Sequence, residues 1–166
     1  MGDNHHRWKP SVTVAAVVSQ DGRYLLVEEM TAEGLKLNNP AGHLDPGESL
    51  LDAVVREVLE ETARPFRPEA LVGTYLARFR HVRSGEDISY LRFAICGDVG
   101  EAIAGRALDE PVQRTLWMTP AELRACPERH RSPLVMQCIE HHLAGVRAPL
   151  SLLHADPSLY GRVARP

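Results

Sequence analysis

One short, strongly acidic stretch constrains this chain more than any other feature. Residues 42–61 are predicted to form a loop that leads into a helix. On an ideal helix of this stretch, one stripe is apolar and comprises Leu51, Val54, Val55, Val58 and Leu59. Glu57, Glu60 and Glu61 fall on the opposite side, where spacings of three and four residues make them neighbours. The pattern predicts a helix buried along one side that carries three adjacent carboxylates.

Three carboxylates on one helical face repel one another by roughly a few tenths of a kcal/mol per pair in water. Arg56 can offset this repulsion, because it lies four residues before Glu60. A hard divalent cation can do the same, since clustered carboxylate oxygens are its natural ligands. The plainer interpretation is a solvated acidic surface. The spacing of the whole stretch argues against it.

Seven residues of this stretch are fixed in type and spacing: Gly42, Glu48, Arg56, Glu57, Val58, Glu60 and Glu61. Together they resemble the signature box of the Nudix hydrolases. The chain departs from the box after Glu61, with Ala63 in place of a glycine and Arg64 in place of an apolar residue. That glycine would end the helix in a left-handed conformation. Ala63 therefore either pays about 1 kcal/mol of steric strain or the helix ends differently, and Pro65 stops it in any case.

The resemblance implies a Nudix fold, an α/β architecture in which a mixed β-sheet is sandwiched between α-helices. It also implies Mg²⁺, for which Mn²⁺ could substitute, and catalytic roles for Arg56, Glu57 and Glu60. Glu60 and Glu61 would be metal ligands, Glu57 a ligand or the general base, and Arg56 the residue that orients the carboxylates. The Glu48 carboxylate and the Gly42 carbonyl would complete the metal shell. A further carboxylate often comes from outside the box, for which Asp109 and Glu110 are candidates, although a surface turn also explains them.

A phosphate substrate also needs positively charged donors, and four arginines are candidates. Arg78 and Arg80 alternate on one predicted strand and so point to the same face. Arg92 lies on the next strand, and any of the three could hold a phosphate with two hydrogen bonds. Arg131 precedes a predicted helix start, a favourable place for an anion. The alternative interpretation of the first three is that they are arginines exposed on a polar strand face, which fits the sequence equally well. For Arg131 the alternative is a purely structural role at the helix cap.

Composition narrows the class of protein. The chain has 166 residues and a net charge of −3, so no bulk basicity attracts nucleic acid. No apolar run approaches the length that spans a membrane, and the first residues lack the apolar core of a signal peptide. Cys96, Cys126 and Cys138 have no metal-binding or redox spacing and are expected to be reduced, mostly buried thiols. We therefore expect a cytoplasmic protein, a monomer or homodimer, with no stable nucleic-acid partner. The pairs His5-His6 and His141-His142 are interpreted as incidental.

The remaining pattern predicts one domain over residues 1–166, with a core at about 10–148 and a surface tail at 149–166. Strands are predicted at 11–19, 24–29, 71–80, 88–96 and 112–118, with a hairpin turn at Asp21-Gly22, a short segment at 35–40 and a loop at 84–87. Ser49 with Asp52 resembles a capping box. Thr119-Pro120 and Ser132-Pro133 each predict a helix start, and Gly145 a helix end.

Several phrases outside the box resemble one phosphatase subgroup of the family: residues 12–15, 27–29, 39–44, 91–93 and 131–135. The subgroup implies hydrolysis of nucleoside tri- and diphosphates, thiamine pyrophosphate and hydroxymethylpyrimidine pyrophosphate, with release of phosphate. One departure is Leu37, near the place where the subgroup is expected to carry a tryptophan. The alternatives are a Nudix hydrolase of RNA 5′ ends or sugar nucleotides, and a catalytically silent ligand-sensing domain. Retention of every box carboxylate argues against the silent domain.

Overall fold

The computed structural model describes residues 8–80 and 84–161, whose strands form two sheets. The larger sheet has the order β5-β1-β7-β6-β9, from strands β1 (Ser11–Val17), β5 (Ala41–His43), β6 (Phe66–Arg80), β7 (Asp87–Val99) and β9 (Ala148–Pro149). Strands β1 and β7 run parallel, and the other pairs are antiparallel. The smaller sheet contains β2 (Ser19–Gln20), β3 (Arg23–Thr31), β4 (Gly34–Asn38) and β8 (Val112–Met118), with β3 between β4 and β8.

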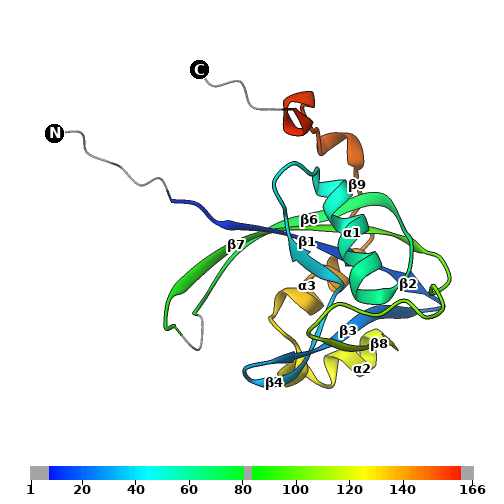
Figure 1. Ribbon diagram of the computed structural model, residues 1–166. Helices are drawn as coiled ribbons and strands as arrows, with labels where there is room; N and C mark the ends of the chain where they lie inside the picture. The colour runs from blue at the N-terminus through cyan, green and yellow to red at the C-terminus, as the bar shows by residue number, and fades with distance from the viewer. Residues whose placement is uncertain (1–7, 81–83, 162–166) are drawn as a thin grey trace.

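The α-helices of the described residues pack around these sheets and are α1 (Leu50–Thr62), α2 (Pro120–Arg124) and α3 (Leu134–Leu143). Short 3-10 turns occur at η1 (Pro127–Arg129), η2 (Leu150–Leu152) and η3 (Pro157–Tyr160). Helices α1 and α3 lie on different sides of the large sheet (Figure 1). Val54 and Val58 of α1 pack with Val14 and Ile95, whereas Val135 and Ile139 of α3 pack in a second cluster. The result is the predicted α/β architecture of mixed sheets between helices.

The predicted strands are present, with changed boundaries. The apolar run that starts at Ser11 splits into β1 and β2 because the chain leaves one sheet for the other near Val18. Strand β6 begins at Phe66, earlier than expected, and its register shifts twice before Gly73. The segment at 35–40 supplies β4. The hairpin turn at Asp21-Gly22 has φ angles of 49° and 73°, the left-handed values that such a turn requires.

The structure also shows the helix caps, the histidine pair near the end of α3 and the state of the cysteines. Helix α2 has its predicted cap at Thr119, but Ser132 does not cap α3, whose first turn follows Pro133 without a side-chain cap. His141 and His142 bond to different tyrosines, Tyr75 and Tyr24, so they do not form a joint site. Cys96 and Cys138 are buried, Cys126 is partly buried, and all three are free thiols. His5-His6 lies outside the described residues.

No helix in the described part of the chain is long and apolar enough to cross a membrane.

Candidate active site

Local sequence fixes the position of α1. The Ser49 side chain accepts a hydrogen bond from the Asp52 backbone at 3.1 Å, and the Asp52 carboxylate accepts one from the Ser49 backbone at 3.0 Å. This is the predicted capping box, which satisfies free N–H groups at the helix start. At the other end Ala63 has φ 55° and ψ 24°, a left-handed conformation, and its N–H bonds to the Leu59 carbonyl. The helix therefore ends as the box predicts, with the strain of an alanine where glycine is usual.

Arg64, the second departure from the box, finds its own partners. Its Nη1 donates to the Gly100 carbonyl at 2.9 Å, and its guanidinium carbon lies 6.0 Å from the centre of the Trp117 ring. A guanidinium over an indole is a favourable contact. Arg64 thus replaces an apolar residue by covering an aromatic one.

Arg56 lies at the centre of the box carboxylates. Its Nη1 donates to Glu57 at 2.7 Å and to Glu60 at 3.0 Å. Its Nε and Nη2 donate to the two oxygens of Glu48 at 3.0 and 2.7 Å, and Nη2 also reaches the His43 carbonyl at 3.0 Å. These bonds hold the Glu48 pKa low and raise the Arg56 pKa. Charge-assisted bonds of this kind orient side chains strongly, so Arg56 holds three carboxylates in place.

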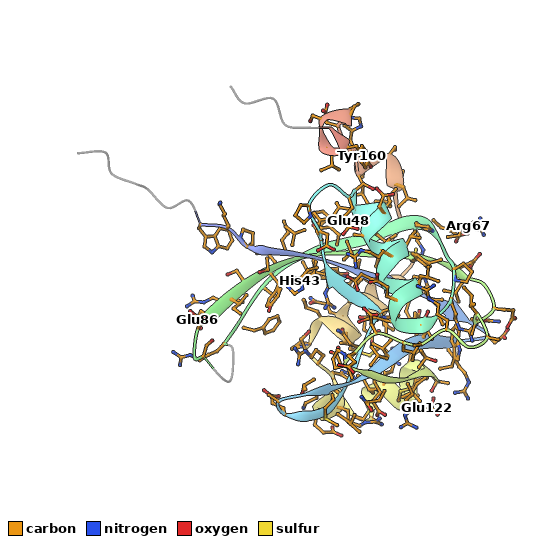
Figure 2. The ribbon with its side chains drawn as sticks, viewed as in Figure 1. His43, Glu48, Arg67, Glu86, Glu122 and Tyr160 are labelled. Atoms are coloured by element: carbon orange, nitrogen blue, oxygen red, sulfur yellow. The ribbon has the colours of Figure 1, made fainter. Side chains whose placement is uncertain are left out.

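Gly42 and Ala41 approach the same helix from β5. A Cβ built on Gly42 would overlap the Glu57 carboxylate, so any larger residue would displace this carboxylate from its place. The Ala41 N–H donates to the Glu61 carboxylate at 2.8 Å. Burial raises the pKa of Glu57. It also raises the pKa of Glu61 to about 8, to which the nearby Glu57 charge contributes. The backbone of β5 therefore lies directly against the acidic face of α1 (Figure 2).

A second group of charges lies behind Glu61. Glu29 on β3 is buried, which raises its pKa, and its carboxylate is 3.4 Å from Arg131 Nε. Arg92 on β7 is also buried, and the Nε and Nη1 of its guanidinium have no hydrogen-bond partner among the described residues. Burial lowers the Arg92 pKa, while Cys138, Glu29 and Glu61 act in the opposite direction. Arg92 therefore lies within electrostatic reach of the box.

The other candidate residues are placed differently. Arg78 pairs with Asp87, and Arg80 donates to the Gly85 carbonyl at 3.1 Å, so both are engaged in the exposed β6–β7 hairpin. The Asp109 N–H donates to the Glu60 carbonyl at 3.0 Å, and the Asp109 charge helps to raise the Glu61 pKa. Glu110 is exposed, and no contact joins it to the box in the described part of the chain.

Sequence reasoning missed two groups near the site. Glu29 carries a buried carboxylate next to Glu61, and Thr13 has a buried hydroxyl without a partner beside Arg92 in the parallel pair of β1 and β7. A signal for Glu29 was available, because two glutamates interrupt an otherwise apolar strand. Its neighbour Glu28 is bound by Arg114 and Arg129 at 2.7 Å each, which ties β3 to β8 and η1.

The donor set suits a hard divalent cation. Four carboxylates and a glycine backbone converge on one side of α1, and their mutual repulsion would be relieved by positive charge. Across residues 8–80 and 84–161, no three acidic, histidine or cysteine side chains are already grouped as metal ligands. The Arg56 guanidinium occupies oxygens of Glu48, Glu57 and Glu60. The carboxylates therefore fit the chemistry of a metal site. Their oxygens would be shared between Arg56 and a cation.

Comparisons with known proteins agree with this geometry. The family model of the NUDIX domain matches residues 7–137. The chain therefore belongs to the Nudix family, whose members are hydrolases of phosphoric anhydride bonds and generally use divalent metal ions.

Particular relatives refine this placement. Phosphatase NudJ of Escherichia coli strain K12 is 33% identical over 147 residues, which cover 88% of this chain and 92% of NudJ. A solved NUDIX hydrolase from Nitrosomonas europaea is 49% identical with a TM-score of 0.82 and covers 89% of this chain and 98% of that one. A MutT NUDIX hydrolase from Burkholderia pseudomallei shares the fold, with a TM-score of 0.66 at 19% identity over 81% of this chain and 98% of that one. The chain is thus similar to NudJ along most of its length.

Proposed function

We propose that this Nudix hydrolase is a Mg²⁺-dependent phosphatase of small diphosphate and triphosphate compounds, with Mn²⁺ able to substitute. Its substrates would be nucleoside tri- and diphosphates and the pyrophosphates of thiamine and hydroxymethylpyrimidine. The observation that carries the proposal is the arrangement of Glu48, Glu57 and Glu60 around Arg56, with Gly42 against Glu57. The similarity to Phosphatase NudJ supports phosphate release as the reaction.

Glu48, Glu57, Glu60, Glu61 and the Gly42 carbonyl would hold the cation. Bound there, it supplies positive charge to the phosphoryl oxygens and acidity to a water molecule. Arg56 would hold the carboxylates in fixed orientations, because its guanidinium bonds three of them at once.

Glu57 would also accept the proton of the attacking water. Its position is fixed on both sides, by Arg56 at 2.7 Å and by the Gly42 backbone. Asp109, beside Glu61, is the better placed of the two candidate carboxylates outside the box. Glu110 would need to move from its exposed position to contribute.

Arg92 is the best candidate to bind a substrate phosphate. Its Nε and Nη1 groups lack partners within residues 8–80 and 84–161, whereas Arg78 is engaged by Asp87 and Arg131 by Glu29. Buried donors without acceptors are costly to a fold. A phosphate held near Glu61 would supply acceptor oxygens to this guanidinium.

Metal dependence tests the proposal first. Purified protein is stripped with a chelator and assayed for phosphate release from nucleotides, thiamine pyrophosphate, sugar nucleotides and dinucleoside polyphosphates, before and after Mg²⁺ is restored. Activity should vanish on chelation and return with Mg²⁺ or Mn²⁺. Full activity in the chelated sample would contradict the proposal.

The bond that breaks tests the substrate class. In ¹⁸O-labelled water a nucleoside triphosphate should give the diphosphate and labelled orthophosphate, one phosphate at a time. Sugar nucleotides should react poorly, because an ester blocks their outer phosphate. Release of intact pyrophosphate in a single step would leave the family assignment in place and reject the phosphatase subgroup.

A further inference from the structure

A row of aromatic side chains leads away from the box along the large sheet. The His43 and Tyr90 rings are 6.2 Å apart, and the Tyr90 and Phe79 rings are 6.1 Å apart. We call these three residues the aromatic strip. His43 comes from β5, Tyr90 from β7 and Phe79 from β6, so the strip crosses the sheet. In Figure 2 His43 lies between α1 and the β6–β7 hairpin.

The strip shares its face of the sheet with Arg92. Tyr90 and Arg92 are two residues apart on β7, so both side chains point to one face. His43 pairs with Thr13, and Thr13 pairs with Arg92, which places all three in one row. Thr13 and Arg92 are two of the residues in the described part of the chain whose buried polar atoms lack hydrogen-bond partners. The aromatic strip therefore adjoins buried hydrogen-bonding groups that have unused capacity.

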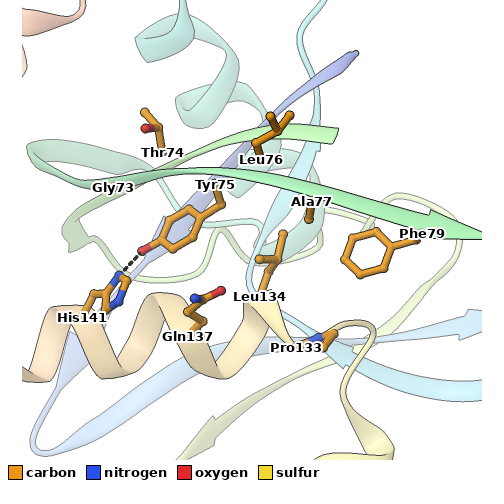
Figure 3. A pocket seen from close by; sticks show the side chains of 10 residues that line it. All are labelled: Gly73, Thr74, Tyr75, Leu76, Ala77, Phe79, Pro133, Leu134, Gln137 and His141. Carbon is orange, nitrogen blue, oxygen red and sulfur yellow. Dashed lines mark hydrogen bonds between the residues drawn. The ribbon is translucent and has the colours of Figure 1, made fainter. Parts of the chain in front are cut away.

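The strip is accessible from solvent. His43 is exposed, and Tyr90 and Phe79 are only partly buried. Phe79 also lines one end of a pocket of about 570 Å³ between β6 and α3. Figure 3 shows Tyr75 and Phe79 on the α3 side of β6 and Leu76 on the opposite side. A flat group can therefore lie on the strip without displacing the core.

We propose that the aromatic strip binds the planar heterocycle of the substrate while the box and Arg92 hold its phosphates. Ligand sites combine aromatic surface with a few convergent polar groups, and the strip with Thr13 and Arg92 has this composition. Two residues of strand separate Arg92 from Tyr90, about 7 Å, a length that a phosphorylated nucleoside spans. This inference rests on the proposed function, and names the part of the substrate that decides preference.

The test compares substrates with and without a heterocycle. The wild-type enzyme with Mg²⁺ should show a higher kcat/KM for nucleoside triphosphates than for inorganic tripolyphosphate. Tyr90→Leu removes the central ring and should lower kcat/KM for nucleotides about 5- to 100-fold, the effect of losing one stacked base. Inorganic tripolyphosphate should be hydrolysed at an unchanged rate. Tyr90→Phe keeps the ring and should behave as wild type, as should Leu76→Ala on the other face of β6.

Binding provides a readout that needs no hydrolysis. A nucleoside monophosphate, which has no anhydride bond, should bind the wild type and Tyr90→Phe in calorimetry, and Tyr90→Leu more weakly. His43→Ala gives the same comparison at an exposed position if Tyr90→Leu fails to fold.

Three outcomes would overturn the inference. They are equal losses for nucleotides and tripolyphosphate, no loss for either, and a wild-type enzyme with no preference for ring-bearing substrates. If the wild type hydrolyses no anhydride at all, the proposed function fails, and monophosphate binding still decides whether the strip recognises a heterocycle.

Discussion

The two arginines nearest the box have opposite environments. Arg56 is partly exposed and donates to three carboxylates and a carbonyl. Arg92 is buried, and its Nε and Nη1 have no partner among the described residues. An arginine whose donors are all occupied by the protein can orient its partners and has little left for a substrate. Arg92 has other acidic neighbours, Glu29 and Glu61. A buried arginine with unpartnered donors weakens the fold and would gain from the acceptor oxygens of a ligand.

This contrast assigns separate roles to two residues that look alike in the sequence. Under the proposed function Arg56 is a positioning residue, because it would act through Glu48, Glu57 and Glu60. Arg92 is a substrate-binding residue under the proposed function. Substitutions that change one role and leave the other should separate metal binding from substrate binding.

The largest expected effect comes from the carboxylates. Glu60→Gln or Glu61→Gln keeps size and removes a negative charge from the proposed metal site. Each should lower kcat by a factor on the order of 10² to 10⁴, since charge stabilisation by a bound metal is worth several kcal/mol. The variants should remain folded, because removing one negative charge from the acidic cluster reduces the repulsion between its carboxylates. Steady-state rates at saturating Mg²⁺ and far-UV circular dichroism check both points. A near-normal rate would place the active site elsewhere.

Much of this site could be predicted because the box is local in sequence. The helical spacing of apolar residues and the capping box of Ser49 and Asp52 were sufficient to predict α1. The spacing of the glutamates was sufficient to predict its acidic face. Thr13 could not be assigned, and the two glutamates in the apolar strand β3 mark Glu29 as unusual without connecting it to the box. Both residues reach the site only when β1 and β3 fold against residues far along the chain. The same limit applies to Arg92 and Arg78. Alternation predicted which strand face each occupies, but only the packing shows that one is buried without partners and the other pairs with Asp87 in a hairpin.

Arg92→Met tests the substrate side of the contrast. It should lower kcat/KM for a nucleoside triphosphate by a factor on the order of 10², the loss expected for a charged hydrogen-bonding partner of phosphate. The free energy of unfolding should stay the same or rise, because the buried donors without partners are gone. The Mg²⁺ concentration for half-maximal rate should not change. A marked loss of stability with an unchanged kcat/KM would make Arg92 a structural residue.

Arg56→Met tests the positioning side. Without the guanidinium, Glu48, Glu57 and Glu60 repel one another, so the metal-free protein should lose about 1 to 3 kcal/mol of stability. Added Mg²⁺ should restore much of it, and the half-maximal Mg²⁺ concentration should rise. Urea unfolding with chelator and with Mg²⁺ measures the difference. A stability that does not respond to Mg²⁺ would contradict the shared use of these oxygens.

The activity of Arg92→Met and Arg56→Met can be compared across pH only if the pH dependence of folding stability is known. Burial lowers the pKa of His142 to about 4, and Arg147 acts in the same direction. Below about pH 6.5 His142 therefore binds a proton in the unfolded chain but stays neutral in the folded chain until the pH approaches 4. Stability is complete above that pH and should fall by about 1 to 2 kcal/mol between pH 6.5 and 4, a value reduced because the ring is half-buried.

His142→Gln removes this titration and keeps an acceptor for the Tyr24 hydroxyl, which lies 2.7 Å from the ring. Urea unfolding of both proteins from pH 7 to 4 should show a smaller loss in the variant. Identical slopes over this range would mean that another group controls the acid response. Activity losses of the arginine variants can then be compared at pH values where the fold is intact.

The smallest effect concerns the exit of the box helix, two residues after Glu61. Ala63→Gly relieves the left-handed strain of about 1 kcal/mol. Against this, it removes a buried methyl group and gives the unfolded chain more freedom. We expect these terms nearly to cancel, so the free energy of unfolding should change by less than about 0.5 kcal/mol.

Ala144 is the matched control. It ends α3 as Ala63 ends α1, but has φ −71° and is exposed, so Ala144→Gly has no strain to relieve and should cost about 0.5 to 1 kcal/mol. The sign of the difference between the two variants in thermal or urea unfolding is the decisive quantity, since the loss of a buried methyl biases the comparison against Ala63→Gly. A larger destabilisation by Ala63→Gly than by Ala144→Gly would show that Ala63 sits in its left-handed conformation without appreciable strain, because only Ala63→Gly loses a buried methyl group. The box in this chain would then tolerate alanine at its end at no cost to the carboxylates that precede it.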